Sequence, residues 1–213
     1  MAAVTETTTA PLRDPDAEGA IESALAAISA PGSFFTGAER LAMAAQTRVA
    51  RGLAETGPDL DPVVAEAVAR VAASAMTSRK SHVQAWVDSG RDVLAYVELV
   101  SVVAQTASID SYRIGLDVEL NMLPGAVDGA PAPEVADGAA IVNAWVPTVG
   151  VALAPTALSA LPREKATKAA LGAAWYITDE VIHQYDVEPG RELTRPQMEL
   201  VAARTSWLNE CFF

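Results

Sequence analysis

The chain has 213 residues, of which 51% are hydrophobic and only 6% aromatic. A chain of this length can bury one sizeable core, and this composition predicts a core made mainly of Ala, Val and Leu. The formal net charge of −12 argues against nucleic acid and against an anionic membrane surface as partners. Because the chain has one cysteine and two histidines, we expect no internal disulfide and no structural zinc or other metal site. We also expect no cofactor.

Two segments differ in character from the predicted helices. Residues 1–15 are polar and are expected to form a disordered tail, and they lack the basic and apolar regions of a signal peptide. Residues 138–162 carry no charge, but three prolines interrupt them, so we expect a buried, irregular crossover and no membrane span. These features predict a cytoplasmic protein with a single domain over 16–213.

Helical periodicity and capping signals follow one another along the chain. Asp14 or Asp16 can begin the first helix, Thr36 and Glu39 have capping-box spacing, and Pro62 follows Asp61 near a first helical position. No strand pattern interrupts these signals, and residues 116–162 form a Pro/Gly-rich connection. The predicted fold class is all-α. The expected helices cover 16–29, 37–55, 62–75, 78–88, 91–115, 163–184 and the region from 194 onward.

Glu98 is the most informative carboxylate. Between Asp92 and Asp110 it is the only charge on the expected helix 91–115, which predicts a helix buried over much of its surface. Burial should raise the pKa of an unpaired carboxyl, as a general acid or base requires. An ion pair with an arginine such as Arg48, Arg113 or Arg204 would explain the same residue without catalysis.

Two internal similarities indicate related helical units over about 31–124 and 140–213. Residues 96–100 match 197–201 at an offset of 101, which aligns Glu98 with Glu199 and Asp110 with Cys211. Residues 35–45 match 193–203 more weakly, at an offset of 158.

The two histidines do not predict a metal site. Glu180 and His183 have the Glu-x-x-His spacing that places both side chains on one helix face, but a di-iron bundle needs two such pairs. His82 has no acidic residue three positions before it and is expected to be solvated or at a helix end.

Five segments carry a family resemblance that covers most of the chain. They are residues 35–45, 96–100 with Ile109-Asp110, Leu123-Pro124, 144–147 and 199–211. Together they resemble the carboxymuconolactone decarboxylase and alkylhydroperoxidase-D-like superfamily. The resemblance implies an all-helical, usually oligomeric, alkylhydroperoxidase-D-like fold.

In the peroxidase branch of that family, a glutamate lies twelve residues before the first cysteine of a Cys-x-x-Cys pair. Glu199 and Cys211 match these two positions, Phe213 stands at a histidine position, and the second cysteine position would follow Phe213. Residues 51–57, where relatives can carry another cysteine pair, contain none. Since that peroxidase cycle needs a resolving thiol, we expect the chain alone not to complete it.

Three functional hypotheses follow. The leading one is a cofactor-independent enzyme with a degenerate redox centre that performs acid/base chemistry on a small carbonyl or lactone-type metabolite. The second is a one-cysteine hydroperoxide reductase in which Glu199 activates Cys211. The third is a non-catalytic subunit, or one whose site a second polypeptide completes. The expected assembly is a homo-oligomer, and the candidate site residues are Glu98, Glu199, Cys211, His183 and Tyr112.

Overall fold

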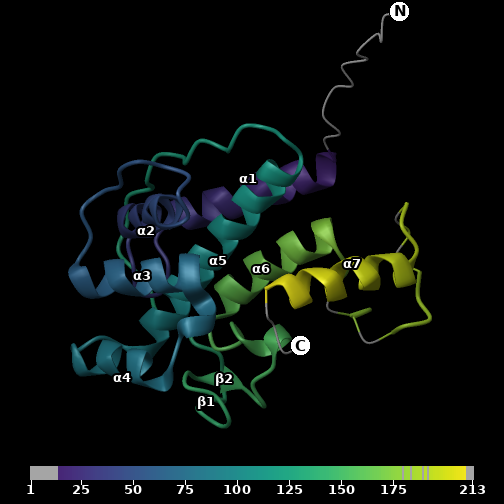
Figure 1. The fold of residues 1–213 in the computed structure, drawn as a ribbon. Coiled ribbons are helices and arrows are strands. Elements are labelled where there is room, and N and C mark those ends of the chain that lie inside the picture. The colour runs from purple at the N-terminus through teal and green to yellow at the C-terminus, as the bar shows by residue number, and fades with distance from the viewer. Residues whose placement is uncertain (1–13, 179, 183, 189, 191, 210–213) are drawn as a thin grey trace, which may run out of the picture.

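The computed structural model describes residues 14–178, 180–182, 184–188, 190 and 192–209. Within these ranges the protein consists of seven α-helices, two short 3-10 turns and one two-stranded sheet (Figure 1), so the expected all-α class is confirmed. The α-helices are α1 (Pro15–Ser29), α2 (Gly37–Ala50), α3 (Pro62–Ser74), α4 (Lys80–Asp88), α5 (Val93–Gly115), α6 (Pro162–Trp175) and α7 (Arg195–Leu208).

Short polar side chains fix where several helices begin. The Asp14 carboxylate accepts from the backbone N–H of Asp16 at 2.9 Å, and Asp92 accepts from Leu94 at 2.7 Å. Thr36 and Glu39 form the predicted capping box at the start of α2. These bonds satisfy backbone donors that have no partner inside the helix, so the predicted starts lie within two residues of the observed ones.

Helix α5 is the central element (Figure 1). Its buried positions occur on most of its faces, because α1, α2, α3, α4 and α6 all contact it. By length and composition it is the one helix among the described residues that could cross a membrane, but 67% of its most apolar window is buried inside the fold. The main apolar core joins it to α2, α3 and α4, where Trp86 meets Tyr96 edge to face at 5.5 Å.

The connection from α5 to α6 lies mostly at the surface. It contains the antiparallel hairpin β1 (Ala139–Ala140) and β2 (Thr148–Val149), followed by the 3-10 turn η2 (Ala154–Thr156). Most described residues of 138–162 are exposed or half-buried, so the expected buried crossover was wrong. Prolines and glycines prevent a helix here, and backbone groups outside regular structure are more easily satisfied by water than in a core.

Two helices end earlier than predicted. Helix α2 ends at Ala50, where Gly52 adopts a positive φ of 72°, and α6 ends at Trp175 before the β-branched residues Ile177 and Thr178. The internal match of residues 35–45 with 193–203, at an offset of 158, aligns the first residues of α2 and α7, Gly37 and Arg195, and also their last residues, Ala50 and Leu208. The two helices therefore have the same length of 14 residues. Both begin with a threonine capping box.

Candidate functional site

Glu98 lies in a buried ionic cluster. Arg40 of α2 places its Nη1 between Glu98 of α5 and Glu164 of α6, donating to both and lying 2.8 Å from Glu164 Oε1. The exposed fractions of the three side chains are only 3%, 0% and 4%. The second oxygen of Glu98 accepts from the backbone N–H of Phe34 at 2.7 Å. Three helices and the α1–α2 loop are therefore joined by one charged cluster.

The α1–α2 loop makes room for this cluster at Gly32. A Cβ atom at this position would lie 1.9 Å from Glu98 Oε1 and 2.4 Å from Arg40 Nη1. Only a residue without a side chain allows so close an approach, since the obstructing atoms are themselves fully packed.

A buried amide extends the cluster. Gln105 Nε2 donates to Ser101 at 2.7 Å and approaches Glu164 at 3.5 Å. Gln105 Oε1 is buried and has no hydrogen-bond partner among the described residues.

The cluster has one cation for two carboxylates. Burial raises the pKa of Glu98, Arg40 opposes this rise, and Glu164 adds to it. Burial lowers the pKa of Arg40, but the two carboxylates raise it above its ordinary value overall. None of the three residues lines the cavities described below. The geometry is that of a buried ion-pair cluster that holds helices together.

The burial of Glu98 was predicted correctly, but its partner was not. The expected arginines were Arg48, Arg113 or Arg204, whereas the observed one is Arg40. Arg48 and Arg113 pair with other carboxylates, at 2.8 and 2.6 Å, and Arg204 is exposed on α7. The helical spacing of Arg40 from the buried residues Gly37, Ala44 and Thr47 was the available signal for its burial.

Glu199, the second candidate carboxylate, lies beside a buried arginine of its own helix. Arg195 is 2% exposed, and its Nε donates to Glu199 Oε1 at 2.6 Å. Its other nitrogens donate to the carbonyls of Val181 and Ile182 at 3.2 and 2.9 Å. The Glu199 side chain remains 41% exposed. Glu199 is thus held in place while water can still reach it.

Tyr176 connects Glu199 to a cavity. Burial and a hydrogen bond to Glu199 raise the pKa of Tyr176 to about 12, and the same hydrogen bond lowers the pKa of Glu199. Tyr176 and Glu188 both line a cavity of about 270 Å³. One oxygen of Glu188 accepts from the backbone N–H of Arg195 at 3.0 Å. A phenol and a carboxylate of one polar network therefore border the same space.

Tyr112 occupies a different environment. Its ring stacks on Trp175 with 5.4 Å between centroids, and burial is the main cause that raises its pKa. It packs against the apolar cluster of α1, α5 and α6. Within the described residues it makes no hydrogen bond with Glu98 or Glu199, so the structure does not bring these three candidates together.

The remaining candidates, His183 and Cys211, lie outside the described residues. Glu180 was expected to share a helix face with His183, but α6 ends at Trp175 and Glu180 lies in a turn, so that part of the prediction was wrong. His82 accepts from the backbone N–H of Arg79 at the start of α4, as expected for a helix-end histidine. In the described ranges, no three His, Cys, Asp or Glu side chains are grouped as metal ligands would be.

Sequence reasoning missed Arg40, Glu164, Tyr176 and Arg195. Glu164 and Arg195 lie in the first turns of α6 and α7, where charged residues ordinarily face water. The contact of Tyr176 with Glu199 depends on how α7 is placed against the end of α6, which no local pattern shows.

Comparison of the chain with protein-family models, with curated proteins and with solved structures finds no match. The resemblance to the carboxymuconolactone decarboxylase and alkylhydroperoxidase-D-like superfamily therefore rests on the five segments of the sequence that carry it.

Proposed function

We propose that this chain is an alkylhydroperoxidase-D-like, carboxymuconolactone decarboxylase-like protein that performs cofactor-independent acid/base chemistry on a small carbonyl or lactone-type compound. The cavity beside Tyr176 is the proposed site. One observation carries the proposal: Tyr176 borders the cavity and hydrogen-bonds to Glu199, which buried Arg195 holds through a 2.6 Å contact. Perturbed titratable groups bordering a cavity are typical of catalytic sites.

The chemistry needs one hydrogen-bond donor for the carbonyl oxygen and one acceptor for the proton on the neighbouring carbon. With a pKa of about 12, Tyr176 is protonated at neutral pH. Its single O–H, which Glu199 accepts in the free protein, can turn to donate to the carbonyl oxygen of a bound substrate. The Glu188 carboxylate on the same cavity can accept the proton from the carbon beside that carbonyl. Returning this proton to another atom gives an isomer, with no net transfer of electrons. Glu199 and Arg195 act as positioning residues for Tyr176.

Proton exchange tests this proposal without knowledge of the natural substrate. A panel of small 2-oxo acids, ketones and lactones is incubated with the protein in D₂O, and loss of the proton beside the carbonyl is followed by NMR. We expect at least one compound to exchange faster with the protein, and Tyr176→Phe to slow that exchange by about 100-fold, the usual worth of a positioned acid. Tyr112→Phe is the matched control and should leave the rate unchanged, since Tyr112 serves to stack on Trp175.

Two results would contradict this function. The first is a panel in which no compound exchanges and none raises the melting temperature, because a ligand that binds the folded state must raise it. The second is sustained hydroperoxide reduction that is lost in Cys211→Ser, which would favour the one-cysteine route. The proposed location of the reaction is the cytoplasm.

A second proposal concerns assembly, and the surface of α7 favours it. We propose that the chain forms a homo-oligomer, or alternatively that another polypeptide covers this surface and completes the site. Among its described residues α7 buries only Arg195 and Met198, while four large apolar side chains are exposed: Leu200, Val201, Trp207 and Leu208. Covering them with a second copy would remove this surface from water. Light scattering should show a dimer or larger assembly that Trp207→Glu dissociates, and a monomeric parent protein would contradict it.

A further inference from the structure

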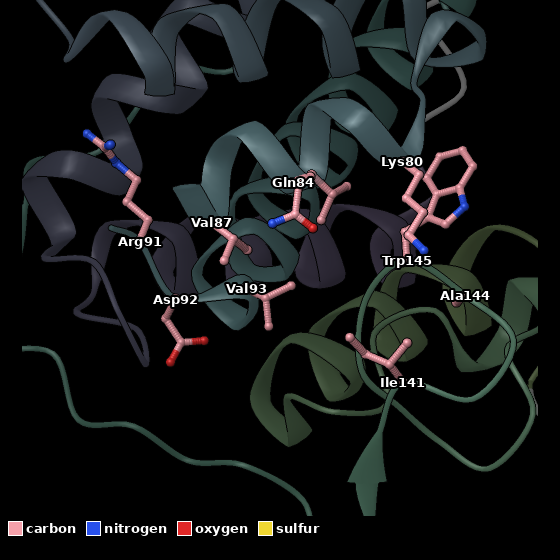
Figure 2. Close-up of a pocket in the computed structure, with 10 residues that line it drawn as sticks. Lys80, Gln84, Val87, Arg91, Asp92, Val93, Ile141, Ala144 and Trp145 are labelled. Carbon is pink, nitrogen blue, oxygen red and sulfur yellow. The ribbon is translucent and has the colours of Figure 1, made fainter. Parts of the chain in front are cut away.

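Two adjoining cavities lie between helices α4 and α5 and the loop that connects β1 to β2. One, here called the charged cavity, has a volume of about 560 Å³ and is bordered by Lys80, Gln84, Arg91 and Asp92 (Figure 2). The other, the apolar cavity, has a volume of about 490 Å³ and is bordered by Val71, Tyr96, Val100 and Val146. Both share Val83, Ala144 and Trp145 as lining residues. The two spaces therefore meet at one wall, and each is within the size range of ligand pockets, about 300–1,000 Å³.

The charged residues of the charged cavity are not equally available to a ligand. Arg91 pairs with Asp61 at 2.7 Å and lies over the ring of Trp86, and Asp92 accepts from the backbone N–H of Leu94. Lys80 has no carboxylate partner among the described residues. Figure 2 shows Lys80 and Trp145 at one end of the lining and Arg91 with Asp92 at the other. The uncommitted cation is thus at the shared wall, and it is the first residue of α4, where the helix dipole also favours an anion.

The wall between the cavities is held in place by its hairpin. The Asn143 side chain accepts from the backbone N–H of Ala152 at 2.7 Å, and Val149 N–H donates to Ser159 Oγ at 2.8 Å. Trp145 is 45% exposed in this fixed loop. An indole held half in water at the mouth of an apolar cavity leaves apolar surface that a ligand can cover.

We propose that these cavities bind an organic carboxylate. Its apolar body lies in the apolar cavity against Tyr96 and Trp145, and its carboxylate lies in the charged cavity at Lys80. The site shares no lining residue with the cavity beside Tyr176, so the inference does not depend on the function proposed there.

The test uses decanoate as the probe and decan-1-ol as its uncharged match, with binding measured by calorimetry on the full chain. We expect decanoate to bind about fivefold more tightly than decan-1-ol, which corresponds to about 1 kcal/mol for one solvent-exposed charge pair. Decyltrimethylammonium has the same chain with the opposite charge and should bind more weakly than either. Equal affinity for the three probes would overturn the role of Lys80.

Variants then locate the two parts of the ligand. Lys80→Gln should remove the preference for decanoate over decan-1-ol, and Lys165→Gln, an exposed lysine of α6, should preserve it. Ala144→Phe fills the shared wall and should weaken both probes while circular dichroism shows an unchanged helical content. Binding that survives Ala144→Phe would place the ligand elsewhere. The parent protein could instead bind no probe and form a dimer that Trp145→Glu dissociates. This result would show that a second copy covers this face, and it would also overturn the proposal.

Discussion

Replacing Arg40 with methionine tests whether the buried cluster is structural. Methionine keeps much of the length of arginine but removes the only cation between Glu98 and Glu164, both of which are at most 4% exposed. Breaking a buried ion pair by removing one partner costs about 3–5 kcal/mol, since the other charge stays buried without compensation. For a chain of this size each kcal/mol lowers the melting temperature by about 2–4 °C. We therefore expect Arg40→Met to melt about 6–20 °C below the parent at pH 7.

The pH dependence makes the test specific. Burial and Glu164 already raise the pKa of Glu98, and loss of Arg40 removes the main group that lowers it, leaving only the hydrogen bond from the Phe34 N–H to oppose the rise. A carboxyl with a raised folded-state pKa contributes stability that is present below its unfolded pKa and is lost as pH rises through the folded value. The deficit of Arg40→Met relative to the parent should therefore shrink between pH 7 and pH 5 in thermal unfolding followed by circular dichroism.

Two companion variants complete this experiment. Arg70→Met removes a pair on α3 with Glu66, whose carboxylate is 68% exposed, and should cost less than about 1 kcal/mol. Glu98→Gln leaves Arg40 paired with Glu164, so it should cost only about 1–3 kcal/mol, the worth of a hydrogen bond to a charged group. A pH 7 loss for Arg40→Met no larger than that of Arg70→Met, or a deficit that does not shrink at pH 5, would refute the reasoning.

Three further outcomes are expected. Gly32→Ala should lower the midpoint of urea unfolding because its Cβ meets Glu98 and Arg40, whereas Gly19→Ala, with nothing within 4 Å, should raise or maintain it. In an ultraviolet absorbance titration Tyr176 should ionise near pH 12, and Glu199→Gln should shift its pKa toward 10. The stability that the raised pKa of Tyr176 contributes is present below pH 10 and is lost as the pH rises through about 12. Cys211→Ser should leave carbonyl proton exchange unchanged, and the parent should show no sustained hydroperoxide turnover with a dithiol, because a lone thiol has no resolving partner in the chain.

Helix starts could be predicted from the sequence because each depends on a few neighbouring residues. The Asp14, Thr36 and Asp92 caps act on backbone N–H groups two or three residues away, so local spacing is sufficient. Helix ends were less predictable. No glycine marks the end of α6 at Trp175, and apolar residues such as Ile177 and Val181 continue the periodic pattern past the true boundary.

The contacts of the candidate site could not be predicted in the same way. Arg40 reaches Glu98 and Glu164 across sequence separations of 58 and 124 residues. A lone charge in an apolar helix indicates burial, but it does not indicate which of 15 basic residues will compensate it. That choice depends on how α2, α5 and α6 cross, which no local pattern determines.

Glu98 and Glu199 show how far a shared local sequence constrains chemistry. Both precede Leu-Val on an α-helix and both contact an arginine, yet one is fully buried and the other 41% exposed. The difference arises from the helices: α5 is enclosed by five others, whereas α7 buries only two of its residues. An enclosed carboxylate with a fixed cation has no access to a substrate, whereas an exposed one hydrogen-bonded to Tyr176 at a cavity does. The proposal of acid/base chemistry therefore rests on the Glu199 network, and the cluster of Glu98 joins α2, α5 and α6.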